Sequence, residues 1–129
     1  MPHLSIDYSS SLEERIDVGS LCGALHVVLM NLDSFPTAGI RVRAHRADHA
    51  IVADGHADND FLAMTLSVGA GRSTAQLKEA GEAIFSVAQA ALSEPLSTPY
   101  FALSLEIREI NAELSWKDTP IHARLSANP

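Results

Sequence analysis

The chain is poor in cysteine and in aromatic residues: it has one cysteine, Cys22, and only 5% of its residues are aromatic. A single thiol cannot form an internal disulfide bond, as is common in proteins of the reducing cytoplasm. No apolar run is long enough to cross a bilayer, and the N-terminal residues lack the basic-then-apolar order of a secretory signal. We therefore expect a cytoplasmic protein that does not associate with membranes.

Basic residues are also scarce, since 9 Lys and Arg face 16 Asp and Glu and the net charge is −7. Such a surface repels nucleic acids, so we expect no nucleic-acid partner. Three arginines nevertheless lie within six positions, at Arg41, Arg43 and Arg46, and Arg72 follows a glycine-rich turn. A cationic cluster in an acidic protein indicates a site for a small anion. The alternative is that these arginines only balance nearby aspartates on the surface.

The pattern of apolar residues predicts one domain over residues 1–129, built from two similar halves. Alternating apolar residues predict strands at 2–8, 39–46, 61–68 and 101–110. Helical spacing of leucines follows the first strand, and a second helical run ends before Pro95. The halves cover residues 2–46 and 61–110, a polar stretch at 48–60 connects them, and a tail without clear periodicity fills residues 111–129.

Two capping boxes support the helix predictions, Ser11 with Glu14 and Ser73 with Gln76. The resulting fold is α+β, with tandem βαβ units, a four-stranded sheet and both crossover helices on one face of it. The other face of the sheet then has no covering layer. Because a sheet needs a second layer and the chain is short, we expect a homo-oligomer.

Pro2 follows the initiator Met1 and opens the first predicted strand. Removal of Met1, which is common before a small residue, would leave a secondary amine at the chain terminus. The pKa of an α-amino group is roughly 7.7–8.0, and burial or nearby cations lower it. Such an amine is suited to proton transfer at neutral pH. The alternative is that a proline at this position is inert.

The segment Gly69-Ala70-Gly71-Arg72-Ser73 lies where the third strand meets the second helix. Free N–H groups and the helix dipole favour an anion there, and an arginine fork suits a carboxylate. The alternative is a tight turn without a ligand.

His45, His49 and His56 lie near aspartates, but their spacing fits no common zinc pattern, so we expect a solvated loop and no metal.

Several segments resemble the 5-carboxymethyl-2-hydroxymuconate isomerases of the tautomerase superfamily, in matching order over nearly the whole chain. They are Met1-Pro2-His3, residues 35–43, Ala53-Asp54-Gly55, Met64-Thr65-Leu66, Gly69–Ser73, Leu103–Ile107 and the Trp116-Lys117 to Ile121-His122 tail.

The resemblance implies a homotrimer with a cofactor-free isomerase activity in homoprotocatechuate (4-hydroxyphenylacetate) degradation. Pro2 would be the catalytic base, moving a proton from the 2-hydroxyl group to C5 of the substrate. Arg41 and Arg72 would bind substrate carboxylates and polarise the developing 2-oxo group, with Arg43 as a further candidate. Two alternatives are a tautomerase homologue acting on another unsaturated dicarboxylate and a non-catalytic βαβ trimer that binds a small anion.

Overall fold

A computed structural model describes residues 1–127 of the chain. The strands are β1 (His3–Ser9), β2 (Arg41–Ala47), β3 (Asp60–Gly69) and β4 (Phe101–Ile110). The α-helices are α1 (Val18–Met30), α2 (Thr74–Ala91), α3 (Ser93–Leu96) and α4 (Pro120–Ala127). Three short 3₁₀ helices are η1 (Ser10–Glu14), η2 (Thr37–Gly39) and η3 (Ala112–Leu114). Within the described residues, no helix is both long and apolar enough to cross a membrane.

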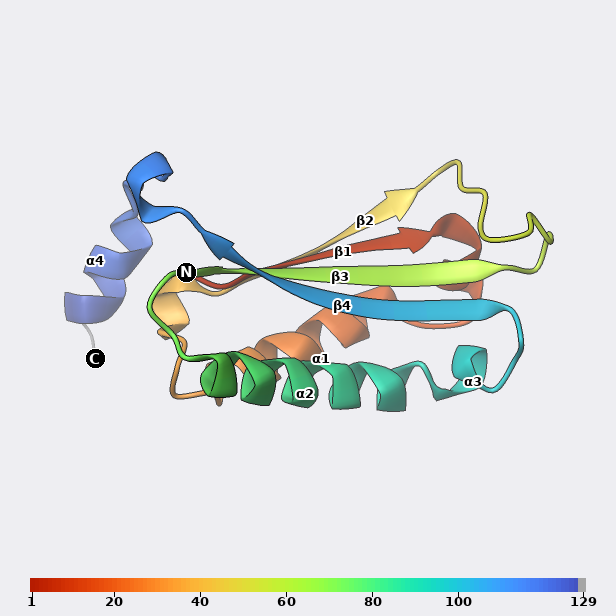
Figure 1. The fold of residues 1–129 in the computed structure, drawn as a ribbon, viewed down its shortest axis with the longest axis horizontal. Coiled ribbons are helices and arrows are strands. Elements are labelled where there is room, and N and C mark those ends of the chain that lie inside the picture. The colour runs from red at the N-terminus through yellow and green to blue at the C-terminus, as the bar shows by residue number, and fades with distance from the viewer. Residues whose placement is uncertain (128–129) are drawn as a thin grey trace.

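The four strands form one sheet in the order β2-β1-β3-β4. β1 pairs with β2 and β3 pairs with β4 in parallel, whereas the two central strands, β1 and β3, are antiparallel. Figure 1 shows α1 and α2 side by side on one face of this sheet. The predicted pair of βαβ units with both helices on one face is therefore confirmed.

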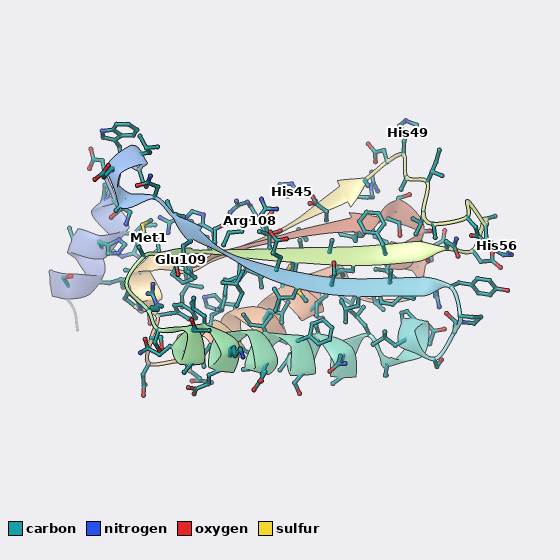
Figure 2. The ribbon with its side chains drawn as sticks, viewed as in Figure 1. Met1, His45, His49, His56, Arg108 and Glu109 are labelled. Carbon is teal, nitrogen blue, oxygen red and sulfur yellow. The ribbon has the colours of Figure 1, made fainter. Side chains whose placement is uncertain are left out.

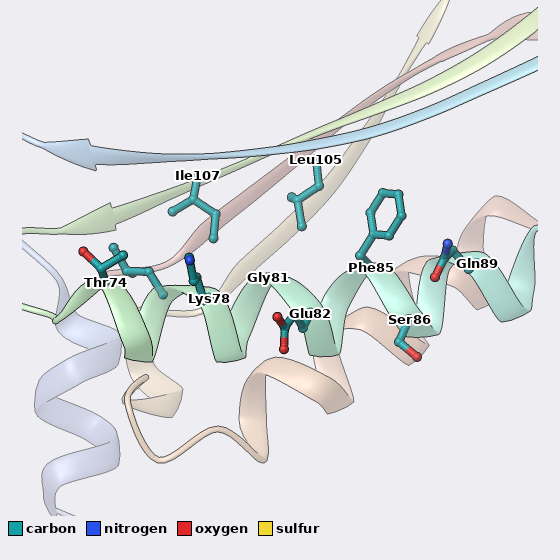
Figure 3. A pocket seen from close by; sticks show the side chains of 10 residues that line it. Thr74, Lys78, Gly81, Glu82, Phe85, Ser86, Gln89, Leu105 and Ile107 are labelled. Carbon is teal, nitrogen blue, oxygen red and sulfur yellow. The ribbon is translucent and has the colours of Figure 1, made fainter.

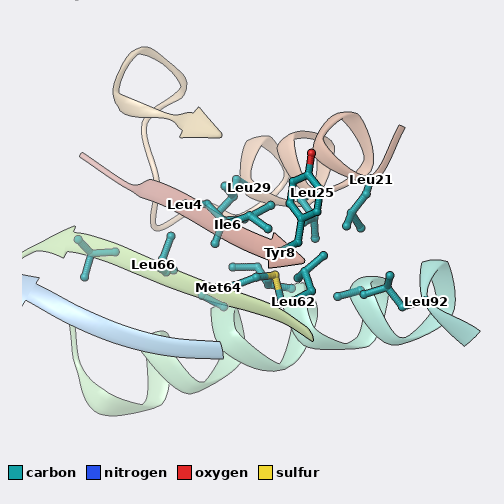
Figure 4. Close-up of a cluster of buried hydrophobic side chains, with 14 of the residues drawn as sticks. Leu4, Ile6, Tyr8, Leu21, Leu25, Leu29, Leu62, Met64, Leu66 and Leu92 are labelled. Carbon is teal, nitrogen blue, oxygen red and sulfur yellow. The ribbon is translucent and has the colours of Figure 1, made fainter. Parts of the chain in front are cut away.

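The core lies between the sheet and the two long helices (Figure 4). In β3 the residues alternate strictly, and Leu62, Met64, Leu66 and Val68 are buried against the helices. The helix α1 contributes leucines to this core, including Leu25, and α2 contributes small or branched residues. Burying one such leucine stabilises a fold by roughly 1.5–3 kcal/mol, so the alternation fixes which face of each strand points inward.

The opposite face of the sheet carries polar residues and no helix covers it. Strand register places Ser5 between Arg43 and Thr65, and Thr65 beside Glu106. On the edge strand β4, Ser104, Glu106 and Arg108 are exposed. This open polar face agrees with the expectation that the sheet lacks a covering layer within one chain.

One of the two capping predictions was wrong. Ser11 does not cap α1 but lies in η1, where its hydroxyl donates to Asp60; burial of Leu12 fixes this 3₁₀ turn. The helix begins later, with Asp17 as its N-cap, and Asp17 accepts a hydrogen bond from the Ser20 backbone N–H. By contrast, the capping box of Ser73 and Gln76 is present at the start of α2.

The second strand starts at Arg41 and not at residue 39, because residues 37–39 form the 3₁₀ helix η2. The tail, in which the sequence shows no clear periodicity, contains η3 and the helix α4. Pro120 occupies the first position of α4, where the missing N–H of proline costs nothing.

Candidate active site at the N-terminus

Pro2 lies at the start of the central strand β1, between β2 and β3, and is buried. Its carbonyl oxygen accepts a hydrogen bond of 3.0 Å from the backbone N–H of Arg41. Gly39 in η2 makes this approach possible: a Cβ atom there would lie 3.1 Å from the Met1 Cα and 3.3 Å from the Pro2 Cδ. Met1 and Pro2 thus pack closely against η2, and Met1 is half-buried.

Arg72 is the most firmly held of the predicted site residues. Its Nε donates to the carbonyl oxygen of Ser34 at 2.9 Å and its Nη1 donates to that of Gly69 at 3.2 Å. Its guanidinium carbon lies 4.7 Å from the centre of the Phe35 ring, a cation–π contact. Two carbonyl groups and one ring fix the guanidinium plane, and further N–H donors of its fork remain for an anion.

Arg41 and Arg43 differ in their surroundings. Arg41 is half-buried, and its Nη1 donates to the Gly39 carbonyl at 2.9 Å, close to the chain terminus. Arg43 is exposed on the open sheet face, where its Nη1 contacts His3 Nδ1 at 3.3 Å. The structure therefore brings Pro2, Arg41 and Arg72 to the same end of the sheet. Arg43 lies two residues further along β2, away from the chain terminus.

The terminal amine, which belongs to Met1, lies in cationic surroundings. Its pKa is lowered first by burial and then by the charges of Lys117, Arg72 and Arg41. The pKa of His3 is also lowered, first by burial and then by Arg41 and Arg43, followed by the terminal amine and Lys117. Such a region disfavours a further positive charge and favours a neutral amine and a bound anion.

Lys117, whose charge lowers the pKa of the Met1 amine, is a candidate site residue that residue-by-residue reasoning missed. It lies in the tail between η3 and α4, a stretch without periodicity, and only the resemblance of the Trp116-Lys117 segment drew attention to it. The end of β4 beside Gly69 and the contact of α4 with η2 bring this stretch to the chain terminus. No sequence pattern indicates that approach, because it depends on tertiary packing.

The other candidate ligands lie elsewhere. Figure 2 shows His49 and His56 at the opposite end of the sheet from Met1. His56 stacks on Tyr100 at 4.6 Å between ring centres, and its Nδ1 accepts from the Asp58 backbone N–H. Within residues 1–127 no group of three or more His, Cys, Asp or Glu is arranged to hold a metal ion. Burial raises the pKa of the Cys22 thiol, which disfavours a reactive thiolate.

A separate hollow of about 670 Å³ lies between α2 and the edge strand β4 (Figure 3). Half-buried apolar side chains line it, among them Phe85, Leu105 and Ile107. It contains neither Pro2 nor any arginine. This groove marks where α2 leaves the inner face of β4 incompletely covered.

Comparison with known proteins gives one consistent group of relatives. The sequence model of the 5-carboxymethyl-2-hydroxymuconate isomerase family matches residues 2–125. The 5-carboxymethyl-2-hydroxymuconate Delta-isomerase of Escherichia coli is 35% identical over 123 residues, which cover 95% of this chain and 98% of that protein. The crystal structure of a 5-carboxymethyl-2-hydroxymuconate isomerase from Deinococcus radiodurans R1 matches with a TM-score of 0.89 at 36% identity, covering 96% of this chain and 93% of that one.

A more distant neighbour shares the fold alone. A fused 4-OT protein, described as a symmetric trimer, matches with a TM-score of 0.63 at 15% identity, covering 90% of this chain and 93% of that chain. The chain thus has the tautomerase-like fold that the sequence resemblance implied.

Proposed function

The chain belongs to the 5-carboxymethyl-2-hydroxymuconate isomerase family, and from this premise we propose that it isomerises 5-carboxymethyl-2-hydroxymuconate with Pro2 as the base. Removal of Met1 turns the Pro2 nitrogen into a free secondary amine. The product is 5-carboxymethyl-2-oxo-hex-3-ene-1,6-dioate. As the family's activity implies, the reaction belongs to the degradation of homoprotocatechuate, and we place it in the cytoplasm.

One observation carries the assignment of the base: Pro2 is buried next to the chain terminus, where several cations act on the Met1 amine. Pro2 is buried, and Lys117, Arg72 and Arg41 all lower the pKa of the amine that precedes it. A secondary amine in the same surroundings would be neutral at moderate pH and able to accept a proton. The same cations attract a polyanionic substrate.

The proposed step balances within the substrate. The Pro2 nitrogen accepts the proton of the 2-hydroxyl group, the C2–O bond becomes a carbonyl, and the double bonds shift to leave one between C3 and C4. The proton then returns from nitrogen to C5. No electrons are exchanged with another molecule, so the step requires no redox cofactor.

In this scheme the arginines bind and polarise the substrate. Arg72, held by the Ser34 and Gly69 carbonyls, offers fixed donors to a carboxylate or to the 2-oxygen as negative charge develops there. Arg41, anchored on the Gly39 carbonyl, is the second such donor. Arg43 faces His3 on the open sheet face and is the least direct of the three candidates.

The experiment that tests this function is an assay in D₂O with protein whose intact mass shows that Met1 has been removed. We expect conversion to the 2-oxo product with deuterium at C5, as observed by NMR. Failure of this protein to isomerise the substrate, under conditions where it is folded, would contradict the proposal.

We further propose that the chain assembles as a homotrimer. Support comes from the open polar face of the sheet and from the symmetric trimer formed by the fused 4-OT neighbour of the same fold. Sedimentation velocity at micromolar concentration should give a mass of about three times the 13.8 kDa chain. A stable monomer would contradict the assembly, and a stable dimer would contradict its symmetry.

A further inference from the structure

The C-terminal segment from residue 111 to residue 119 is anchored at both of its ends beside the chain terminus. At its start, β4 ends at Ile110, which pairs with Gly69 of β3. A Cβ atom on Gly69 would lie 3.8 Å from the Met1 nitrogen and 3.9 Å from Arg72 Nη1. The segment therefore leaves the sheet directly next to the proposed base and Arg72.

At its other end, the segment leads into α4, which packs against η2. That short helix contains Gly39, the residue that closely approaches Met1 and Pro2. Thr119 and His122 stabilise the start of α4 through a side-chain hydrogen bond of 2.7 Å. Figure 1 shows α4 at the same end of the sheet as the N-terminus. The tail thus forms a wall of the candidate active site.

Lys117 lies on this wall and adds a third cationic side chain to the site. The charges of Lys117 from the tail, Arg72 from the β3–α2 turn and Arg41 from β2 all act on the Met1 amine and lower its pKa. The charge of Lys117 also contributes to lowering the pKa of His3. Lys117 is exposed, while the two arginines are half-buried and tied to backbone carbonyls.

The proposed substrate has three carboxylates: two end the planar muconate chain and the third ends the carboxymethyl branch. We propose that Lys117 binds the carboxylate of this carboxymethyl branch and so selects a tricarboxylate over a dicarboxylate, an inference that rests on the function proposed above. The two arginines are fixed in orientation, which suits the rigid conjugated chain. Lysine has a flexible stem and no planar fork, which suits a branch attached through a rotatable CH₂ group.

The test compares Lys117→Gln with Lys78→Gln, since Lys78 is the only other lysine and lies on α2 beside the separate groove. Each variant is assayed with 5-carboxymethyl-2-hydroxymuconate and with 2-hydroxymuconate, which lacks the carboxymethyl group. The second compound is measured as a substrate or, if it does not react, as a competitive inhibitor. All assays are run at a pH where the amine is neutral in every variant.

We expect Lys117→Gln to lower kcat/KM for the tricarboxylate about tenfold, mainly through KM, as for loss of a charge-assisted hydrogen bond at an exposed site. Its effect on 2-hydroxymuconate should be clearly smaller, about threefold or less, because only general attraction between a cation and an anion is lost, and Lys78→Gln should change neither value by more than about twofold. Equal losses for both compounds, or no loss for the tricarboxylate, would overturn the assignment.

A second measurement, made without substrate, separates this inference from the proposed function. In protein labelled with ¹⁵N-proline, the pKa of the Pro2 amine should rise in Lys117→Gln, because a nearby positive charge has been removed, and stay unchanged in Lys78→Gln. An unchanged pKa in Lys117→Gln would show that Lys117 does not reach the site. If the wild-type protein fails to isomerise the tricarboxylate, the proposed function fails, whereas this titration still decides where Lys117 lies.

Discussion

Protein that retains Met1 is expected to lose its isomerase activity by a factor on the order of 10²–10⁴, the range associated with a general base. With Met1 in place the Pro2 nitrogen is an amide, which cannot accept a proton at neutral pH. Met1 is also half-buried beside Gly39, in the space directly in front of Pro2. Inserting a glycine between Met1 and Pro2 produces the same amide even after Met1 has been removed, and kcat/KM for each form reports the loss.

Pro2→Ala provides the matched control for this prediction. After Met1 removal it retains a primary amine at the same position, so it should keep weak activity that clearly exceeds that of the glycine-insertion variant. Intact mass identifies the N-terminal residue of every sample. A glycine-insertion variant as active as the wild type would show that the base lies elsewhere.

Arg72→Met is expected to lower kcat/KM by about 10- to 100-fold, which corresponds to losing a hydrogen bond to a charged group of about 1.5–3 kcal/mol. Methionine keeps apolar bulk beside Phe35 but removes the donors that face the substrate. Arg72→Lys should restore activity only in part, because an ammonium group lacks the planar fork. Arg41→Ala should act in the same direction.

Arg46→Met is the control for these substitutions. Arg46 is exposed near the far end of β2, where it pairs with Glu13 and Asp48, so its replacement should leave kinetics near the wild-type values. Wild-type kinetics in Arg72→Met and Arg41→Ala would instead show that these arginines only balance surface charge.

The paired βαβ halves were predictable because each strand alternates apolar and polar residues, and this alternation marks the buried face directly. Leu62, Met64 and Leu66 show the pattern in full. The start of α1 was not predictable in the same way. Ser11 has the sequence of a capping residue, but burial of Leu12 and the hydrogen bond of Ser11 to Asp60 decide its structure.

The candidate site likewise contains residues that could be predicted from the sequence and one that could not. Pro2 and the arginines are visible in the sequence because their residue types are unusual at those positions. Lys117 is not, because its place beside the terminus follows from the contact of α4 with η2. An isolated lysine in an aperiodic tail is normally a surface charge, and only the packing of the tail makes Lys117 a candidate for the site.

The pH dependence of kcat/KM, measured on protein with Met1 removed, tests the role of Pro2 most directly. The active form of the Pro2 amine is neutral. Burial and neighbouring cations lower the pKa of the Met1 amine below its ordinary value, and we expect the same surroundings to lower that of the Pro2 amine once Met1 has been removed. Activity should therefore rise with pH, about tenfold per unit below an apparent pKa lying under the usual α-amino value of roughly 8, and level off above it. That apparent pKa should equal the one obtained by titrating the ¹⁵N-labelled Pro2 amine. A profile with no ascending limb, or one that follows a pKa different from that of the Pro2 amine, would contradict the account.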